Sequence, residues 1–137
     1  MKNLIFYCIC FSVLSQTVSM ASESKFEILA QGSRSWEGSM FNYPAGDVQI
    51  TIARVMVSKG EKIPLHYHPA PLAAYVMNGA IEVTTLAGKK KTFYKGEAFI
   101  ETMGVAHYGI GIEKQTELLV FYAWVKDLPL SIKAADK

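Results

Sequence analysis

Cysteine is nearly absent from this chain. Its two cysteines, Cys8 and Cys10, both lie in an apolar stretch at the N-terminus, and none occurs in the remaining residues. A domain formed by those residues has no disulfide bond, no thiolate metal ligand and no cysteine nucleophile. A cysteine-free domain also suits an oxidising compartment, because it contains no thiol that could mispair.

An excess of charge of one sign is also lacking. The chain has 14 Lys and Arg residues against 12 Asp and Glu residues, which gives a formal net charge of +2. The largest basic cluster, residues 89–91, falls in an expected turn. A nucleic-acid surface needs a broader basic patch with interleaved aromatic side chains. The sequence therefore gives no reason to expect a nucleic-acid partner.

The N-terminal apolar run is too short for a permanent membrane span. It covers residues 4–14, after Lys2, whereas a spanning helix needs about 20 residues. Small residues at Ser19 and Ala21 fit the −3 and −1 positions of a signal-peptidase site. We therefore expect a signal peptide over residues 1–21, cleaved after Ala21, and a periplasmic or secreted mature protein without a stable membrane span. The alternatives are an uncleaved anchor and an ordinary buried N-terminal strand.

A helical period is missing from the rest of the chain. Short alternating or apolar segments are separated by turn residues at a spacing of roughly 8–12 residues, which is typical of an antiparallel sandwich or barrel. Asn78-Gly79, between residues 73–77 and 80–86, is a strong hairpin signal. The apolar residues 116–125 predict a central strand.

The expected strand at residues 48–57 has an irregular pattern. Apolar and polar residues alternate as far as Arg54, and Val55-Met56-Val57 then changes the phase. Such a change indicates either a β-bulge or a strand that is covered on both faces. We predict one all-β domain, with an N-terminal segment and edge strands at residues 22–46, the barrel at 47–132 and a C-terminal tail at 133–137.

Three histidines carry the chemical information. His66 and His68 are separated by one residue, a spacing that on a strand places both imidazoles on one face about 6.6 Å apart. Pro64 and Pro69 flank the pair and exclude a helix there. A metal ion needs such a pair and a further donor from another strand, and His107 is the remaining histidine. Taken singly, each is more commonly a hydrogen-bonded core or surface residue.

The segments around these histidines resemble the two signature motifs of the cupin superfamily. Residues 60–79 match the first motif at both of its glycines and at its His-x-His pair. Residues 102–107 resemble the second motif, a Pro-x-Gly-x-x-His element that supplies another histidine ligand. The resemblance implies a jelly-roll β-barrel with a metal ion on His66, His68 and His107.

The sequence departs from both motifs. Leu72 stands where the family has a glutamate ligand, Thr102 replaces the proline, and Gly111 replaces the final asparagine. The resemblance therefore implies three neutral imidazoles, which leave open coordination positions and the full charge of the ion. Some cupin dioxygenases use such a set, so Fe²⁺ is the expected ion, with Zn²⁺, Ni²⁺, Mn²⁺ or Cu²⁺ as alternatives. A barrel that lost its metal together with the glutamate is the other possibility.

The implied function is that of an exported, mononuclear metalloenzyme with dioxygenase-like chemistry on a small, anionic substrate. The alternatives are a metal-dependent isomerase or hydrolase and a non-catalytic barrel that binds a small ligand. Glu101 is the candidate catalytic residue, as a general base, as an outer partner of a ligand or as a substitute ligand. It could equally be a solvated carboxylate at the barrel rim. By resemblance we expect a homodimer that is paired through edge strands.

Overall fold

The computed structural model describes residues 24–135, so the expected signal peptide lies outside the described residues. Within residues 24–135 the chain forms strands and no helix, and therefore no helix that could cross a membrane. The strands are β1 (Val48–Ser58), β2 (His66–Tyr67), β3 (Leu72–Asn78), β4 (Ala80–Thr85), β5 (Lys90–Tyr94), β6 (Ala98–Ile100), β7 (His107–Gly111), β8 (Gln115–Val125) and β9 (Ile132–Lys133).

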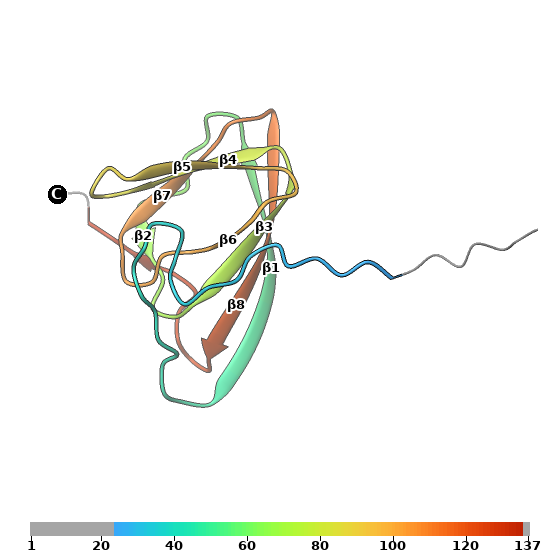
Figure 1. Ribbon diagram of the computed structural model, residues 1–137. Helices are drawn as coiled ribbons and strands as arrows, with labels where there is room; N and C mark the ends of the chain where they lie inside the picture. The colour runs from blue at the N-terminus through green and yellow to red at the C-terminus, as the bar shows by residue number, and fades with distance from the viewer. Residues whose placement is uncertain (1–23, 136–137) are drawn as a thin grey trace, which may run out of the picture.

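These strands form two antiparallel sheets that pack face to face (Figure 1). One sheet has the order β1-β8-β3-β6, and the other has the order β5-β4-β7-β2-β9. The apolar segment at residues 116–125 is confirmed as a central strand, because β8 pairs with β1 on one side and with β3 on the other. This is the all-β jelly-roll fold that the sequence predicts.

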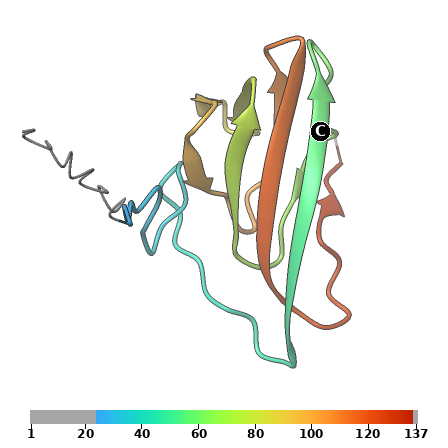
Figure 2. The same ribbon diagram turned by 90° about the vertical axis from the view of Figure 1, so that its right-hand side faces the viewer.

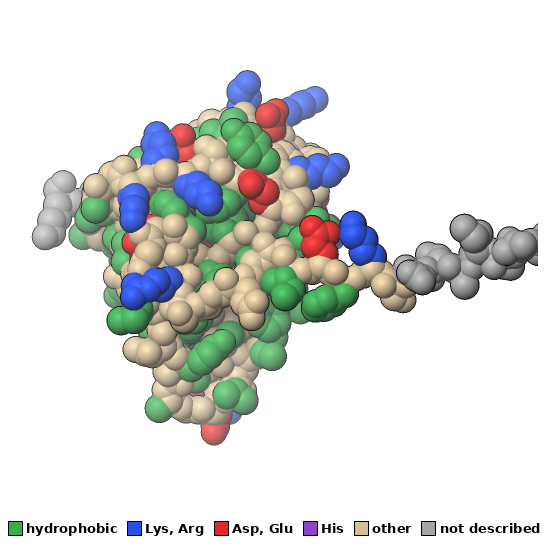
Figure 3. All heavy atoms as spheres, in the orientation of Figure 1, with side chains coloured by type: hydrophobic (Ala, Val, Ile, Leu, Met, Phe, Trp, Pro, Cys, Tyr) green, Lys and Arg blue, Asp and Glu red, His purple; other side chains and the backbone are tan. Residues whose placement is uncertain are grey.

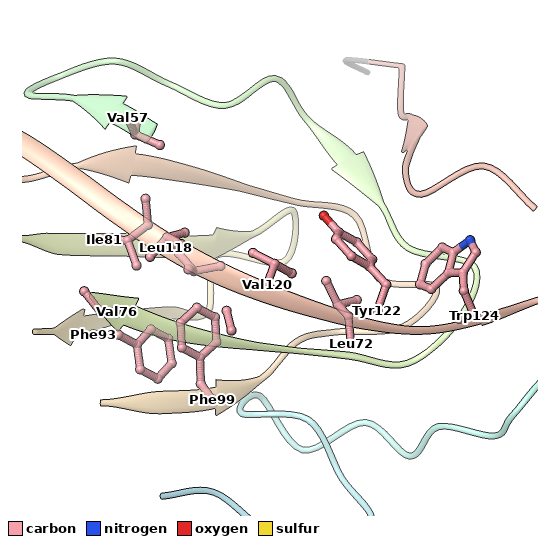
Figure 4. Close-up of a cluster of buried hydrophobic side chains, with 13 residues drawn as sticks. Val57, Leu72, Val76, Ile81, Phe93, Phe99, Leu118, Val120, Tyr122 and Trp124 are labelled. Carbon is pink, nitrogen blue, oxygen red and sulfur yellow. The ribbon is translucent and has the colours of Figure 1, made fainter. Parts of the chain in front are cut away.

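The core lies between the two sheets (Figure 4). It is built from alternate, inward-pointing side chains, as the period of two along a strand requires. Its large members are Val57, Leu72, Val76, Ile81, Phe93, Phe99, Leu118, Val120, Tyr122 and Trp124. Five of these side chains, Leu72, Ile81, Leu118, Val120 and Tyr122, also line the cavity that holds the histidines.

The prediction of a β-hairpin at Asn78-Gly79 is wrong. β3 and β4 belong to different sheets, and the chain crosses from one sheet to the other at Gly79. The glycine is still required, because its φ is +72° and a Cβ there would lie 2.5 Å from the carbonyl oxygen of Gln115. Asn-Gly signals a positive φ, which serves a tight hairpin and a corner between sheets equally well.

Of the two interpretations offered for the first strand, a β-bulge or a strand covered on both faces, the structure excludes the bulge. β1 pairs with β8 in unbroken register over all its 11 residues. Ala53, Val55 and Val57 face the core, whereas Ile52 and Met56 point outward and are more than half exposed. The change of phase therefore reflects a strand that is apolar on both faces, of which only the inner one is covered within residues 24–135.

Candidate metal centre

The structure brings the three predicted histidines together. His66 lies in β2 and His68 directly follows it, while His107 begins β7. β2 and β7 are antiparallel neighbours, and His66 is the register partner of His107. Ring centroids are 4.5 to 5.2 Å apart, and one candidate ligand atom from each ring lies within 4.8 Å of the other two. Two sequence motifs about 40 residues apart thus meet through the pairing of two strands.

Hydrogen bonds orient each ring in the same way. The Nδ1 atoms lie 2.7 Å from the carbonyl oxygen of Pro64 for His66, 2.8 Å from that of Leu130 for His68, and 2.9 Å from that of Val105 for His107. A carbonyl oxygen can only accept, so every Nδ1 carries the proton and donates it. Every Nε2 therefore keeps a free lone pair, which is the state that a metal-binding imidazole needs.

The spacing of these nitrogens fits a shared cation. The Nε2 atoms of His66 and His68 are 3.2 Å apart. Both are acceptors in this tautomer, so no proton lies between them to offset the repulsion of two lone pairs. Two nitrogens at about 2.0–2.1 Å from one ion, at angles between 90° and tetrahedral, lie about 2.8–3.4 Å from each other. The His66–His68 pair therefore has the spacing of two ligands of one ion, and a donor atom of His107 lies within 4.8 Å of both.

Burial keeps these imidazoles neutral. His68 and His107 are only 4% and 2% exposed, and no histidine is visible on the face shown in Figure 3. Burial lowers the pKa of all three rings, and that of His68 to about 3. At neutral pH the rings carry no proton on Nε2, so metal binding does not have to displace one.

Glu101 points into the same cavity rather than into solvent at the rim. Its Oε2 lies 3.6 Å from Nε2 of His107, is buried and has no hydrogen-bond partner among residues 24–135. Burial raises the pKa of Glu101 to about 7. Its backbone N–H donates to the carbonyl oxygen of Leu72 at 3.0 Å. A carboxylate therefore stands beside the position where the family motif has its glutamate.

The cavity wall is mostly apolar. The cavity has a volume of about 160 Å³, which corresponds to roughly five water molecules at ~30 Å³ each. Besides the three histidines and Glu101, its polar members are Tyr122 and Ser131. These two carry no motif in the sequence, and neither does the Leu130 carbonyl, which lies 62 residues from the ring that it orients. Sequence analysis missed all three because Tyr122 reaches the cavity from β8 in the opposite sheet, and Leu130 and Ser131 lie just before β9, which pairs with β2.

Thr102 is a further residue whose role the sequence did not reveal. It is fully buried, and its Oγ1 lies 2.7 Å from Nδ1 of His107 and donates to the Val105 carbonyl oxygen at 3.2 Å. The Thr102 hydroxyl therefore helps to fix the orientation of the His107 ring, whose Nδ1–H also bonds to the Val105 carbonyl oxygen. Its position in the second motif, where the family has proline, was the available signal.

We expect Thr102→Val to weaken metal binding about 10- to 100-fold, as loss of an outer hydrogen bond to a ligand does. The measurement is a competition titration with a chromophoric chelator. Thr84→Val is the matched control, because Thr84 is also buried but its Oγ1 has no partner and it lies outside the cavity. Equal affinities of the wild type and Thr102→Val would show that the hydroxyl does not position His107.

Two antiparallel sheets around an inward-facing cluster of three imidazoles define a small barrel of the jelly-roll class with a candidate metal site. Comparison with known families identifies it further. The cupin domain family matches residues 53–122, which is just over half of the chain. This chain therefore belongs to the cupin family. A search of curated protein sequences finds no match.

Solved structures show the same fold at low sequence identity. An oxalate oxidase matches with a TM-score of 0.53 and 24% identity, over 62% of this chain and 46% of its own. The DMSP lyase DddQ from Ruegeria pomeroyi matches with 0.55 and 16%, over 62% and 43%. The polyketide cyclase RemF from Streptomyces resistomycificus matches with 0.55 and 17%, over 72% and 70%. The chain spans less than half the length of the first two.

Proposed function

We propose that this protein is an exported metalloenzyme that binds one divalent ion on His66, His68 and His107 and acts on a small anionic molecule. The observation that carries the proposal is the convergence of three Nε2 lone pairs, each held in that orientation by an Nδ1–H bond to a carbonyl oxygen. Fe²⁺ with dioxygenase-like chemistry is the specific form of the proposal, because imidazole ligands suit iron and leave positions open.

The residues of the chain have separate tasks in this proposal. When bound, the ion supplies a positive charge that attracts and orients an anionic, chelating group. Leu72, Ile81 and Val120 line the cavity and exclude water from it. Glu101 takes up or delivers a proton at Oε2, which is free of other partners. Ser131 and the hydroxyl of Tyr122 are available to hold the polar end of a substrate.

The size of the cavity supports a small substrate. A volume of about 160 Å³ accommodates a short organic acid better than a molecule with several rings. One of the similar structures is an oxalate oxidase, whose named substrate is a small acid. We extend this comparison to the present chain as a proposal about the size and charge of its substrate.

The test combines elemental analysis with turnover. Protein recovered from its native compartment is expected to contain about one metal ion per chain, with iron as the main element. Oxygen consumption is then measured with small carboxylic acids, diketones, flavonols and thiols, before and after removal of the metal. Turnover that requires the metal supports the enzyme. Tight ligand binding without turnover would instead support a binding protein, and protein without metal would contradict the proposal.

Export is proposed on the N-terminal pattern of Lys2, the apolar residues 4–14 and the small residues Ser19 and Ala21. A mature protein recovered outside the cytoplasm with Ser22 as its first residue is the expected result of N-terminal mass analysis. An intact N-terminus on the recovered protein would contradict cleavage after Ala21. A homodimer is also part of the proposal, and sedimentation velocity on the purified protein tests it.

A further inference from the structure

The cavity that holds the histidines opens beside the C-terminal strand. Of the described residues that line the cavity, Ser131 is exposed, whereas the others are buried or half-buried. Ser131 directly precedes β9, which is the edge strand next to β2. In Figure 2 the red C-terminal segment leaves the lower end of β8 and returns upward to β9. A ligand that enters the cavity from solvent therefore passes this segment.

A second hollow lies at this opening. It has a volume of about 270 Å³ and is lined by Ile63, Pro64, Leu65, His66, Ser131 and Lys133. Ile63, His66 and Ser131 also line the cavity, so the two hollows adjoin. We call the outer hollow the vestibule. The lining of the vestibule contains no carboxylate, and Lys133 gives it a positive charge.

Strand pairing places Lys133 on the face of the sheet that carries the metal site. His66 is the register partner of Lys133 across β2 and β9, and of His107 across β2 and β7. Register partners in an antiparallel pair point to the same face, with Cβ atoms about 4.5–5.5 Å apart. Ser131 and Lys133 are two residues apart and share this face. The Lys133 side chain therefore starts on the face of the imidazoles, at the open edge of the sheet.

Hydrogen bonds hold the short strand β9 in place on both sides. Before it, the Leu130 carbonyl oxygen accepts from Nδ1 of His68 at 2.8 Å. After it, the backbone N–H of Ala134 donates to the Leu65 carbonyl oxygen at 3.0 Å. Lys133 lies between these two anchors. Because the anchors do not involve the Lys133 side chain, a substitution there changes the charge of the vestibule and leaves the strand in position.

The charge of Lys133 is not offset within residues 24–135. Its side chain is exposed and forms no salt bridge with the described residues. Lys90, by contrast, pairs with Glu82 at 2.9 Å, and the Nζ of Lys62 lies 3.9 Å from the centre of the Tyr108 ring. An exposed lysine is ordinary by itself. A lysine at the mouth of a cavity with three convergent imidazoles is placed to bind the outer end of an anion.

We propose that Lys133 selects a substrate with two anionic groups, of which one binds at the ion and the other pairs with the Lys133 ammonium group in the vestibule. This inference rests on the proposed function, since it requires an ion on the three histidines. The mostly apolar cavity wall suits the short carbon chain between the two groups. The substrate class is therefore a short dicarboxylate or an acid with a comparable second anionic group.

Calorimetric titration of the Zn²⁺-loaded protein tests this selection, because zinc has no redox chemistry and binding can be measured without turnover. The probes are acids paired by carbon count: malonate with propionate, succinate with butyrate, and glutarate with valerate. The wild type is expected to bind at least one diacid about 5-fold more tightly than its monoacid partner. Lys133→Gln is expected to bring this ratio close to 1, Lys133→Glu to reverse it, and Lys133→Arg to keep it.

Lys95→Gln is the matched control, since it removes the same charge elsewhere. Lys95 is an exposed lysine in the turn after β5, which lies at the opposite edge of the same sheet from β9. It lines neither the cavity nor the vestibule. The ratio of diacid to monoacid affinity is expected to be unchanged in this variant. Equal zinc content and melting temperature in every variant show that the fold and the metal site are intact.

The outcomes separate this inference from the proposed function. Chelation of the ion by both carboxylates would also favour a diacid, so a ratio that survives Lys133→Gln would overturn the role of Lys133 and leave the proposed function standing. A zinc-loaded protein that binds neither kind of acid would contradict the anionic substrate, and the selection with it. Diacids that bind the metal-free protein equally well would contradict the position of one carboxylate at the ion.

Discussion

Replacing His68 with alanine is expected to remove the bound metal and to lower the melting temperature by roughly 10 °C. Two imidazoles cannot hold an ion as tightly as three, and the ring of His68 is also tied to the Leu130 carbonyl oxygen at 2.8 Å. A ligand present at 100 to 1,000 times its Kd stabilises the native state by about 3–4 kcal/mol. For a domain of this size that energy corresponds to a shift of about 10 °C or more.

The measurement is metal content by elemental analysis, together with thermal unfolding with and without a chelator. His66→Ala is expected to behave in the same way, because both rings contribute Nε2 to the cluster. Ser131→Ala is the control, since it changes the wall of the same cavity without removing a nitrogen. If both histidine variants keep a full complement of metal, the ligand assignment is refuted. If the chelator-treated wild type melts at about the same temperature as His68→Ala, the lower melting temperature of the variant is due to loss of the metal.

Glu101→Gln is expected to reduce turnover by about 10²–10⁴-fold while leaving the metal in place, as loss of a general base does. Glutamine has nearly the same shape but cannot take up a proton. The substitution also removes a buried carboxylate whose Oε2 has no partner, so the melting temperature of the metal-free protein should stay the same or rise. The measurements are steady-state kinetics on a substrate identified by the oxygen-consumption assay, metal content and thermal unfolding.

Two outcomes separate the roles open to Glu101. Loss of turnover with full metal content identifies a proton-transfer group. Loss of metal affinity would instead identify Glu101 as a ligand that replaces the missing glutamate at Leu72, its hydrogen-bonded neighbour. Glu97→Gln is the matched control, because Glu97 is an exposed glutamate only four residues earlier. Full activity in Glu101→Gln would remove Glu101 from the mechanism altogether.

The central strand of the sheet was predictable from local pattern, whereas the pairing of strands was not. Residues 116–125 are apolar and β-branched or aromatic, and they form β8 between two neighbours. Asn78-Gly79 correctly marked a sharp change of direction with a positive φ at Gly79. It did not reveal that the next strand joins the opposite sheet, because local sequence encodes the dihedral angle and not the partner strand.

The pattern of the first strand also left open which of its faces is covered. Ile52 and Met56 were recognised as apolar, but their pattern was interpreted as a bulge or a doubly covered strand. The unbroken register with β8 shows that these side chains point outward instead. Apolar side chains on an outward face resemble core side chains in sequence, and only coordinates separate the two.

The sequence alone determined the all-β class, the cupin resemblance and the identity of the three imidazoles, because a His-x-His pair on a strand has a face that its spacing dictates. Tertiary structure alone decided what surrounds those rings. The Leu130 carbonyl that orients His68 and the carboxylate of Glu101, whose backbone N–H is bonded to Leu72, reach the site through contacts between separate segments. Such contacts depend on how the sheets pair and pack, and no local periodicity specifies that arrangement.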